Sequence, residues 1–217
     1  MVQIHTETAE ERSAGRAGIR PEAAGESADA RRREILAAAS RLFRERGFAA
    51  TGMRDIAAAL DMTAGSLYYY FENKEALLAY CQEATLDELA APAAGPGGER
   101  SPAAARLRRA IVAHVVALNE RHPGSLAHLE VEALGAERRA PLLRKRRDYE
   151  RRLEQLIREG VEDGSLAPCD PRLATLALLG SLNWTVKWFR EGGGKSAGQV
   201  GDAFADLFLR GLEARAS

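Results

Sequence analysis

The chain has 217 residues, of which 46% are hydrophobic, and this is enough for one or two compact units with a core. The chain has 31 lysines and arginines and 31 aspartates and glutamates, so its formal net charge is zero. A zero net charge does not exclude DNA binding, because the electric field that attracts phosphate depends on the local arrangement of charges. Cys81 and Cys169 lie far apart, which argues against a disulfide framework. The first residues lack an apolar core segment and no apolar run has membrane-spanning length, so we expect neither a signal peptide nor a membrane span. We therefore expect a soluble, cytoplasmic protein.

The first 28 residues are polar and rich in alanine, glycine and glutamate, and they include Pro21. They show no periodic apolar face, so we expect a disordered arm over residues 1–28. From Asp29 onward the apolar residues recur at helical spacing, and no segment alternates as a strand does. A first helix is predicted to end at Gly47, with an apolar face formed by Ile35, Leu36, Ala39, Leu42 and Phe43.

Three further helices are predicted between residues 51 and 89, each preceded by a side chain that can accept the first N–H groups of the helix. In chain order these caps are Thr51, Thr63 and Asn73. The helix after Thr63 is short, residues 64–70, and a tight turn at Asp61 and Met62 separates it from the helix before.

A proline- and glycine-rich loop at residues 91–102 separates this small unit from the rest of the chain. Beyond it, helices are predicted over 103–121, 125–136 and about 142–161. Two more follow: one over 170–189, which begins with Asp170 as cap and Pro171 in the first turn, and a final helix capped by Ser196. The sequence thus predicts an all-α protein of about nine helices. Its expected organisation is the arm over 1–28, a three-helix domain over 29–78 and a larger helical domain over 79–217.

The short helix over residues 64–70 is unusually rich in hydroxyl groups. Leu67 and Phe71 lie four residues apart, so they share one side, which we expect to be buried. The hydroxyl-bearing residues then point outward around two small ones, Ala64 and Gly65. Such a helix can approach the major groove closely, and its N-terminal N–H groups can meet phosphate. Ordinary aromatic packing explains at most two of the three consecutive tyrosines, since they point in three directions.

Residues 31–78 closely resemble the N-terminal helix-turn-helix domain of the TetR family of transcription regulators. The family pattern T-x-x-R-D-I-A is matched by Thr51 and residues 54–57. The pattern G-[ST]-L-Y-x-[HY]-F-x-x-K-x-x-L is matched by residues 65–71 with Lys74 and Leu77. The one departure is Tyr70, where histidine is commoner, and tyrosine keeps a hydrogen-bonding ring. About a dozen constrained positions agree, which makes the signal specific.

The resemblance implies that ten residues bind DNA. Those expected to face base edges are Thr63, Ala64, Gly65, Ser66 and Tyr69. Those expected to hold phosphates are Thr51, Arg54, Tyr68, Tyr70 and Lys74. The resemblance also implies a homodimer on a pseudo-palindromic double-stranded operator, and a repressor that a small-molecule effector releases.

Two segments of the C-terminal domain are candidates for the dimer contact. Small residues at 175, 177, 180 and 181 form a stripe on the helix over 170–189, and the last helix offers Phe204, Leu207, Phe208 and Leu212. Two such helices from each subunit can form a four-helix interface. Both stripes could also belong to the core of one chain; because the TetR family is dimeric, we favour the interface.

Residues 181–193 and 201–212 are similar to the C-terminal domain of TetR-type repressors of sterol and fatty-acid catabolism that respond to acyl-CoA thioesters. Trp184 and Trp188 lie one helical turn apart with Lys187 beside them, and an aromatic platform with a cation suits an adenine ring and phosphates. Arg147, from the basic run 144–147, and His114 complete the predicted effector site. The tryptophans could equally anchor the core or the dimer, the basic run could be a solvated face, and His114 could be a satisfied core residue.

No motif indicates catalysis, a cofactor or a metal: HExxH, zinc-spaced Cys/His, GxSxG, Walker and Rossmann patterns are all missing from the sequence. We therefore expect a regulator and not an enzyme. Two other functions stay open at this point. One is a multidrug-efflux-type TetR repressor that senses hydrophobic compounds, and the other is a non-regulatory helical carrier or enzyme that binds a CoA ligand.

Overall fold

The computed structural model describes residues 21–91, 101–121 and 131–211. Within these ranges the chain forms eight α-helices, a π-helical turn and a 3-10 turn, without any strand, so the predicted all-α fold is confirmed. The arm predicted over residues 1–28 lies mostly outside the described part, and so does much of the helix predicted over 125–136. Of that helix, the structure describes the 3-10 turn Val131–Ala133 and the start of the following helix.

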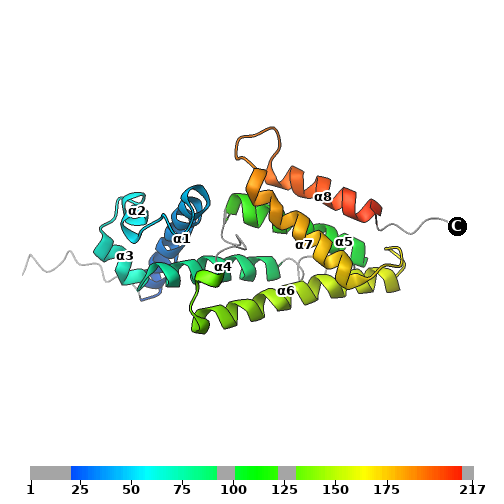
Figure 1. Cartoon of the computed structure of the whole chain (residues 1–217), viewed down its shortest axis with the longest axis horizontal. Helices are drawn as coiled ribbons and strands as arrows, with labels where there is room; N and C mark the ends of the chain where they lie inside the picture. The colour runs from blue at the N-terminus through cyan, green and yellow to red at the C-terminus, as the bar shows by residue number, and fades with distance from the viewer. Residues whose placement is uncertain (1–20, 92–100, 122–130, 212–217) are drawn as a thin grey trace, which may run out of the picture.

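A small N-terminal unit contains α1 (Pro21–Arg46), α2 (Met53–Ala58) and α3 (Ala64–Tyr70), and it lies at one end of the molecule (Figure 1). Its core includes the fully buried side chains of Ile35, Ile56 and Leu67. The start of α1 at Pro21 corrects the boundary predicted at residue 29. Proline fits the first turn of a helix, and the alanines and glutamates that follow favour helix even without an apolar face.

The larger domain contains the five remaining α-helices. They are α4 (Lys74–Ala90), α5 (Ala103–Val116), α6 (Ala136–Glu162), α7 (Pro171–Trp188) and α8 (Ala197–Gly211). The helix α4 leaves the small unit and extends alongside α6 into this domain (Figure 1). The helices α5 and α8 approach closely, because a Cβ atom on Gly201 would lie only 2.8 Å from the Cα atom of Val112.

Besides the cap of α3, described below, three of the predicted helix caps are confirmed. The Asn73 side chain accepts the N–H of Ala76 at 2.8 Å, and the Asp170 carboxylate accepts the N–H of Arg172 at 2.9 Å. Ser196 and Gln199 form a reciprocal pair: the Ser196 hydroxyl accepts from the Gln199 N–H, and the Gln199 side chain accepts from the Ser196 N–H. These side chains satisfy N–H groups that have no partner within their own helices.

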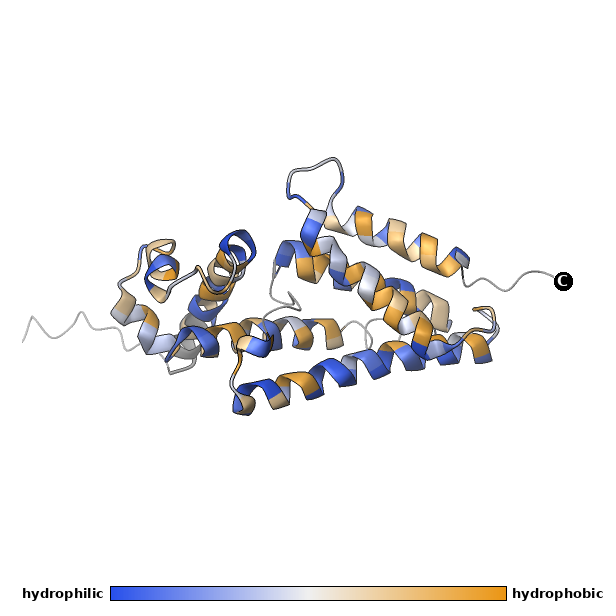
Figure 2. Cartoon of the chain, viewed as in Figure 1, coloured by the Kyte–Doolittle hydropathy of each residue, from blue (hydrophilic) through white to orange (hydrophobic). Residues whose placement is uncertain are grey.

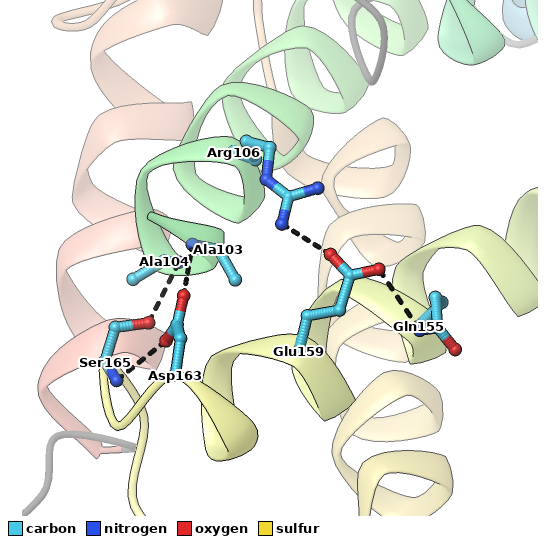
Figure 3. A network of polar contacts seen from close by, with 7 residues as sticks. All are labelled: Ala103, Ala104, Arg106, Gln155, Glu159, Asp163 and Ser165. Atoms are coloured by element: carbon cyan, nitrogen blue, oxygen red, sulfur yellow. Dashed lines mark hydrogen bonds and ion pairs between the residues drawn. The ribbon is translucent and has the colours of Figure 1, made fainter. Parts of the chain in front are cut away.

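A polar network joins the start of α5 to the end of α6 (Figure 3). The Asp163 carboxylate accepts the backbone N–H of Ala103 at 3.0 Å, and the Ser165 hydroxyl accepts the next N–H at 3.3 Å. One turn further along α5, Arg106 forms an ion pair with Glu159, which lies one turn before Asp163 on α6. The first turn of α5 therefore receives its capping groups from residues about 60 positions later in the chain.

Hydrophobic residues follow much of α7 and α8, whereas α6 is largely hydrophilic (Figure 2). The core of the larger domain lies between these helices and α5, with Leu107, Ile111 and Leu182 completely buried. None of the helices in the described ranges is long and apolar enough to cross a membrane.

Candidate nucleic-acid interface and ligand-binding interior

The short helix α3 presents one anchoring side and one exposed side. Leu67 is completely buried, whereas Tyr68 and Tyr69 are 51% and 85% exposed. Thr63 caps the helix, as predicted, by accepting the N–H of Ser66 at 3.1 Å, and the two hydroxyl groups also lie 2.8 Å apart. The predicted base-facing residues therefore share one accessible surface, although Ala64 is half-buried.

The turn before α3 fixes the angle between α2 and α3. Asp61 has a φ angle of 52°, in the left-handed region, which aspartate tolerates better than most residues. The helix α2 begins after Gly52, whose N–H is accepted by the Asp55 carboxylate at 2.7 Å. The prediction that Thr51 caps this helix was wrong by one residue.

Thr51 and Lys74 stabilise the unit from within. The Thr51 side chain is 1% exposed, and its hydroxyl donates to the carbonyl of Gly47 at 2.8 Å, at the end of α1. This geometry corrects the prediction that Thr51 holds a phosphate, since its only proton is used inside the protein. The Lys74 ammonium donates to the carbonyl of Phe48 at 2.7 Å and lies 4.2 Å from the centre of that residue's ring.

Lys74 therefore fixes the loop between α1 and α2, a role that its sequence position did not reveal. A lysine ammonium has three protons, so a phosphate contact by Lys74 stays a prediction. Arg54 and Tyr68 are exposed on the same small unit, and Tyr70 is half-buried beside Tyr69, with their ring centres 5.3 Å apart.

Interdomain contacts join this unit to the larger domain at two places. Arg44, on α1, donates to the carbonyl of Phe189 at 2.7 Å, at the end of α7. Arg138, on α6, forms an ion pair with Glu72, which lies between α3 and α4. Sequence reasoning missed both contacts, because nothing in the local pattern around Arg44 indicates a partner 145 residues away.

A buried polar cluster lies among the helices α5, α6 and α7. His114 is 1% exposed, and its two ring nitrogens lie 3.0 Å from the Tyr149 hydroxyl and 3.0 Å from the Asn183 side-chain oxygen. The His114 and Tyr149 rings also stack, with their centres 5.7 Å apart. Burial raises the pKa of Tyr149, so its phenol stays protonated and keeps a hydrogen to donate.

A second buried pair lies nearby, where α5 continues into the π-helical turn Ala117–Arg121. The Asn119 amide donates to the Thr185 hydroxyl at 2.7 Å, and its own oxygen is enclosed without a hydrogen-bond partner. Two polar clusters thus stand inside an apolar core, which is the composition of an interior that can orient a small molecule.

The structure does not gather the five predicted effector residues into one site. His114 points into the core, but Trp184 is 64% exposed, and Lys187 and Arg147 are also exposed. Asn183, one residue before Trp184, is the one that reaches His114. Consecutive helical residues point about 100° apart, so Trp184 faces outward.

Trp188 stacks on Phe204 of α8, with ring centres 6.3 Å apart. Both rings line a cleft of about 350 Å³ at the turn between α7 and α8, where Arg190 and Lys195 supply cations. Trp188 is therefore a predicted effector residue that lies in a cleft beside positive charge.

The comparisons with known proteins agree with this architecture. A family model described as "Bacterial regulatory proteins, tetR family" matches residues 35–81, and one described as "Tetracyclin repressor-like, C-terminal domain" matches residues 100–212. The chain belongs to the TetR family. As a TetR-family member it is a DNA-binding transcription repressor with a C-terminal ligand-binding domain.

The TetR relatives include the HTH-type transcriptional repressor KstR2 of Rhodococcus jostii. It is 31% identical over 185 residues, which are 84% of this chain and 91% of that protein. The KstR2 of Mycobacterium tuberculosis is 28% identical over 85% of this chain and 94% of that protein.

Solved TetR-family structures share the fold. The structure of the ketosteroid transcriptional regulator KstR2 of Mycobacterium tuberculosis covers 85% of this chain and 96% of its own, with a TM-score of 0.76 and 27% identity. The structure of AibR in complex with isovaleryl coenzyme A and operator DNA covers 84% of this chain and 97% of its own, with a TM-score of 0.66 and 27% identity.

In the described ranges of this chain, no group of three or more His, Cys, Asp or Glu side chains is placed to hold a metal ion.

Proposed function

We propose that this protein binds a pseudo-palindromic operator as a homodimer and leaves it when an acyl-CoA thioester binds. The observation that carries the DNA-binding part is α3, a seven-residue helix with Leu67 buried and Tyr69 85% exposed. Most of this large aromatic ring lies in water, so it contributes little to the core of the folded chain. Its exposure leaves it available to a partner, and its position within the TetR motif supports DNA as that partner.

Gly65 also supports DNA binding by α3. A Cβ atom at this position would meet only the Thr63 hydroxyl oxygen, at 3.8 Å, which is ordinary van der Waals contact. Packing within the chain therefore does not require glycine here, although glycine weakens a helix relative to alanine. Because Gly65 has no side chain, the backbone of α3 can approach base edges closely at this position.

Base contacts are proposed for Thr63, Ala64, Gly65, Ser66 and Tyr69, and phosphate contacts for Arg54, Tyr68, Tyr70 and Lys74. Phosphate contacts fix the register of the helix on DNA, and base contacts provide the specificity.

The outer faces of α7 and α8 support the homodimer. Leu173 and Trp184 on α7 are 63% and 64% exposed, and Leu207 on α8 is 69% exposed. Gly180 is exposed between the first two and allows close helix approach. An exposed apolar face of this kind is typical of a subunit interface, and a two-fold dimer presents two copies of α3 to two half-sites.

Two observations support an acyl-CoA effector. The cleft at the α7–α8 turn combines Trp188 with Arg190 and Lys195, which suits an adenine ring and phosphates. The AibR structure holds isovaleryl coenzyme A together with operator DNA, and KstR2 is named as a ketosteroid regulator. A hydrophobic drug-like effector is the second candidate, because the core around Leu182 and Ile111 is apolar.

The test is release of DNA from the purified protein. A labelled DNA fragment from upstream of the protein's own gene is bound, and octanoyl-CoA, free CoA, octanoate or a neutral hydrophobic dye is added in parallel. We expect octanoyl-CoA to release the DNA and the dye to have no effect. Release by the dye alone would assign the protein to the efflux-type repressors, and no binding to the upstream DNA at low salt would contradict the operator proposal.

A further inference from the structure

The helices α4 and α6 enclose a polar pair that none of the roles above uses. Arg146 lies on the face of α6 that points into the domain, between the buried residues Leu142 and Tyr149. Its guanidinium donates to the side-chain oxygen of Gln82 at 3.1 Å, and Gln82, on α4, is completely buried. A cation thus stands on a helix face where apolar contacts would be expected.

Two hydrogen-bond donors of this pair have no acceptor. The Nε atom of Arg146 and the Nε2 atom of Gln82 are both enclosed without a hydrogen-bond partner. No carboxylate in the described part of the chain pairs with Arg146, whereas the preceding residue, Lys145, pairs with Asp87 at 2.8 Å. Desolvation by burial lowers the pKa of Arg146, in agreement with a charge that lacks a counterion.

We propose that Arg146 and Gln82 form a subsite for an anionic oxygen group of the effector, a carboxylate or a phosphate. Such a group offers several acceptor lone pairs and at least one negative charge, which suit the donors of the two side chains. Arg146 is only partly buried, so an anion can reach it from solvent. The inference rests on the proposed function in one respect, because the ligand of this subsite is the effector.

The position of the subsite links it to DNA release. Gln82 lies on α4, whose first residue, Lys74, holds the loop between α1 and α2. Glu75 joins the start of α4 to the start of α6. An anion drawn in between Gln82 and Arg146 changes the separation of α4 and α6, and α4 is continuous with the DNA-reading unit.

The first test needs no ligand. The double variant Gln82→Met/Arg146→Met replaces both polar side chains by apolar ones of similar length, and Arg139→Met, at an exposed position of α6, is the matched control. A binding subsite costs stability when empty, so we expect the double variant to melt at or above the wild-type temperature. A melting temperature several degrees below wild type would mean that the pair is a structural tie, and the proposal would be wrong.

The second test measures binding by calorimetry with four probes: octanoyl-CoA, free CoA, octanoate and the uncharged octanamide. We expect Arg146→Met to weaken each anionic probe that binds the wild type by roughly ten- to hundredfold, since hydrogen bonds to charged groups are worth more than neutral ones. Octanamide should bind both proteins alike, and Arg139→Met should bind as wild type does. Loss for free CoA identifies a phosphate as the anion, and loss for octanoate identifies a carboxylate.

The outcomes separate this inference from the proposed function. If octanoyl-CoA releases DNA and Arg146→Met binds every anion as wild type does, the subsite is wrong and the proposed effector stands. If octanoate binds through Arg146 while octanoyl-CoA releases no DNA, the subsite stands and the proposed effector is wrong. Failure of all three anions to bind the wild type would overturn both.

Discussion

Tyr69 has the largest exposed fraction among the exposed large hydrophobic side chains of the described residues, 85%. Leu67, two positions earlier, is completely buried. The residues of one sequence motif therefore divide into two kinds, those that hold the small unit together and those that face a partner. Thr51 belongs to the first kind, because its hydroxyl is occupied by the carbonyl of Gly47.

For Tyr69 we predict that the change Tyr69→Ala abolishes specific operator binding and leaves the melting temperature and the dimer unchanged. Its ring contributes little to the core, whereas one lost base contact costs roughly 1–3 kcal/mol of binding free energy. A gel-shift titration measures the effect, with Leu67→Ala as a control that should unfold the small unit instead. Wild-type operator affinity in Tyr69→Ala would show that Tyr69 does not read bases.

At the scale of the elements, side chains from distant parts of the chain complete the helix ends. The first turn of α5 depends on Asp163, which follows α6, and on Ser165 (Figure 3). The Ser165 side chain and the N–H groups of Ala103 and Ser165 hold the pKa of Asp163 below its usual range. The ionised carboxylate therefore stabilises the junction between α5 and α6.

For Asp163 we predict a pH-dependent stability difference. The variant Asp163→Asn keeps an oxygen for the Ala103 N–H and removes the charge, so it should melt below wild type at neutral pH. Because folding lowers the pKa of Asp163, its contribution is present above the unfolded value, about 3.9, and disappears as the pH falls through the lower folded value. The two melting temperatures, measured from neutral pH to about pH 3, should therefore converge in acid. A gap that stays constant with pH would contradict the assignment.

At the scale of the whole molecule, the outer face of α7 and α8 leaves large apolar side chains exposed in the single chain. Single exposed apolar residues are common, but Leu173, Trp184 and Leu207 lie on two helices of the same domain and are each more than 60% exposed. A second copy of the chain would cover them. The two-fold arrangement would also set the distance between the two α3 helices.

For Leu207 we predict that Leu207→Glu gives a folded monomer. The side chain is 69% exposed in the single chain, so the change should not disturb its core, but a buried unpaired carboxylate would oppose dimer formation. Sedimentation velocity should show half the wild-type mass, and operator affinity should fall roughly a hundredfold or more because two half-sites are no longer bound together. The control Ala140→Glu, at an exposed position of α6, should stay dimeric. A dimeric Leu207→Glu would place the interface elsewhere.

The helices and most of their caps could be predicted from the sequence, because both depend on residues close together in the chain. Asn73, Thr63 and Asp170 cap the helices that follow them, as their residue types indicate. The start of α1 could not be predicted in this way. Its first eight residues lack an apolar face, and they extend a helix that the core forms further along.

By itself, the sequence determined the fold class, the family and which residues of α3 share a side, since all three follow from local spacing. The tertiary structure alone decided which sides of α6 and α7 face inward. The spacing of Trp184 and Trp188 puts them on one side of α7, but Asn183 is the residue that α7 turns toward His114. Arg146 belongs to a basic run for which the sequence left both a solvated face and a contact with CoA phosphates open, and the structure turns it toward Gln82. The reason is that helical periodicity fixes the directions of side chains relative to one another, and only the helices packed around them decide which direction is the interior.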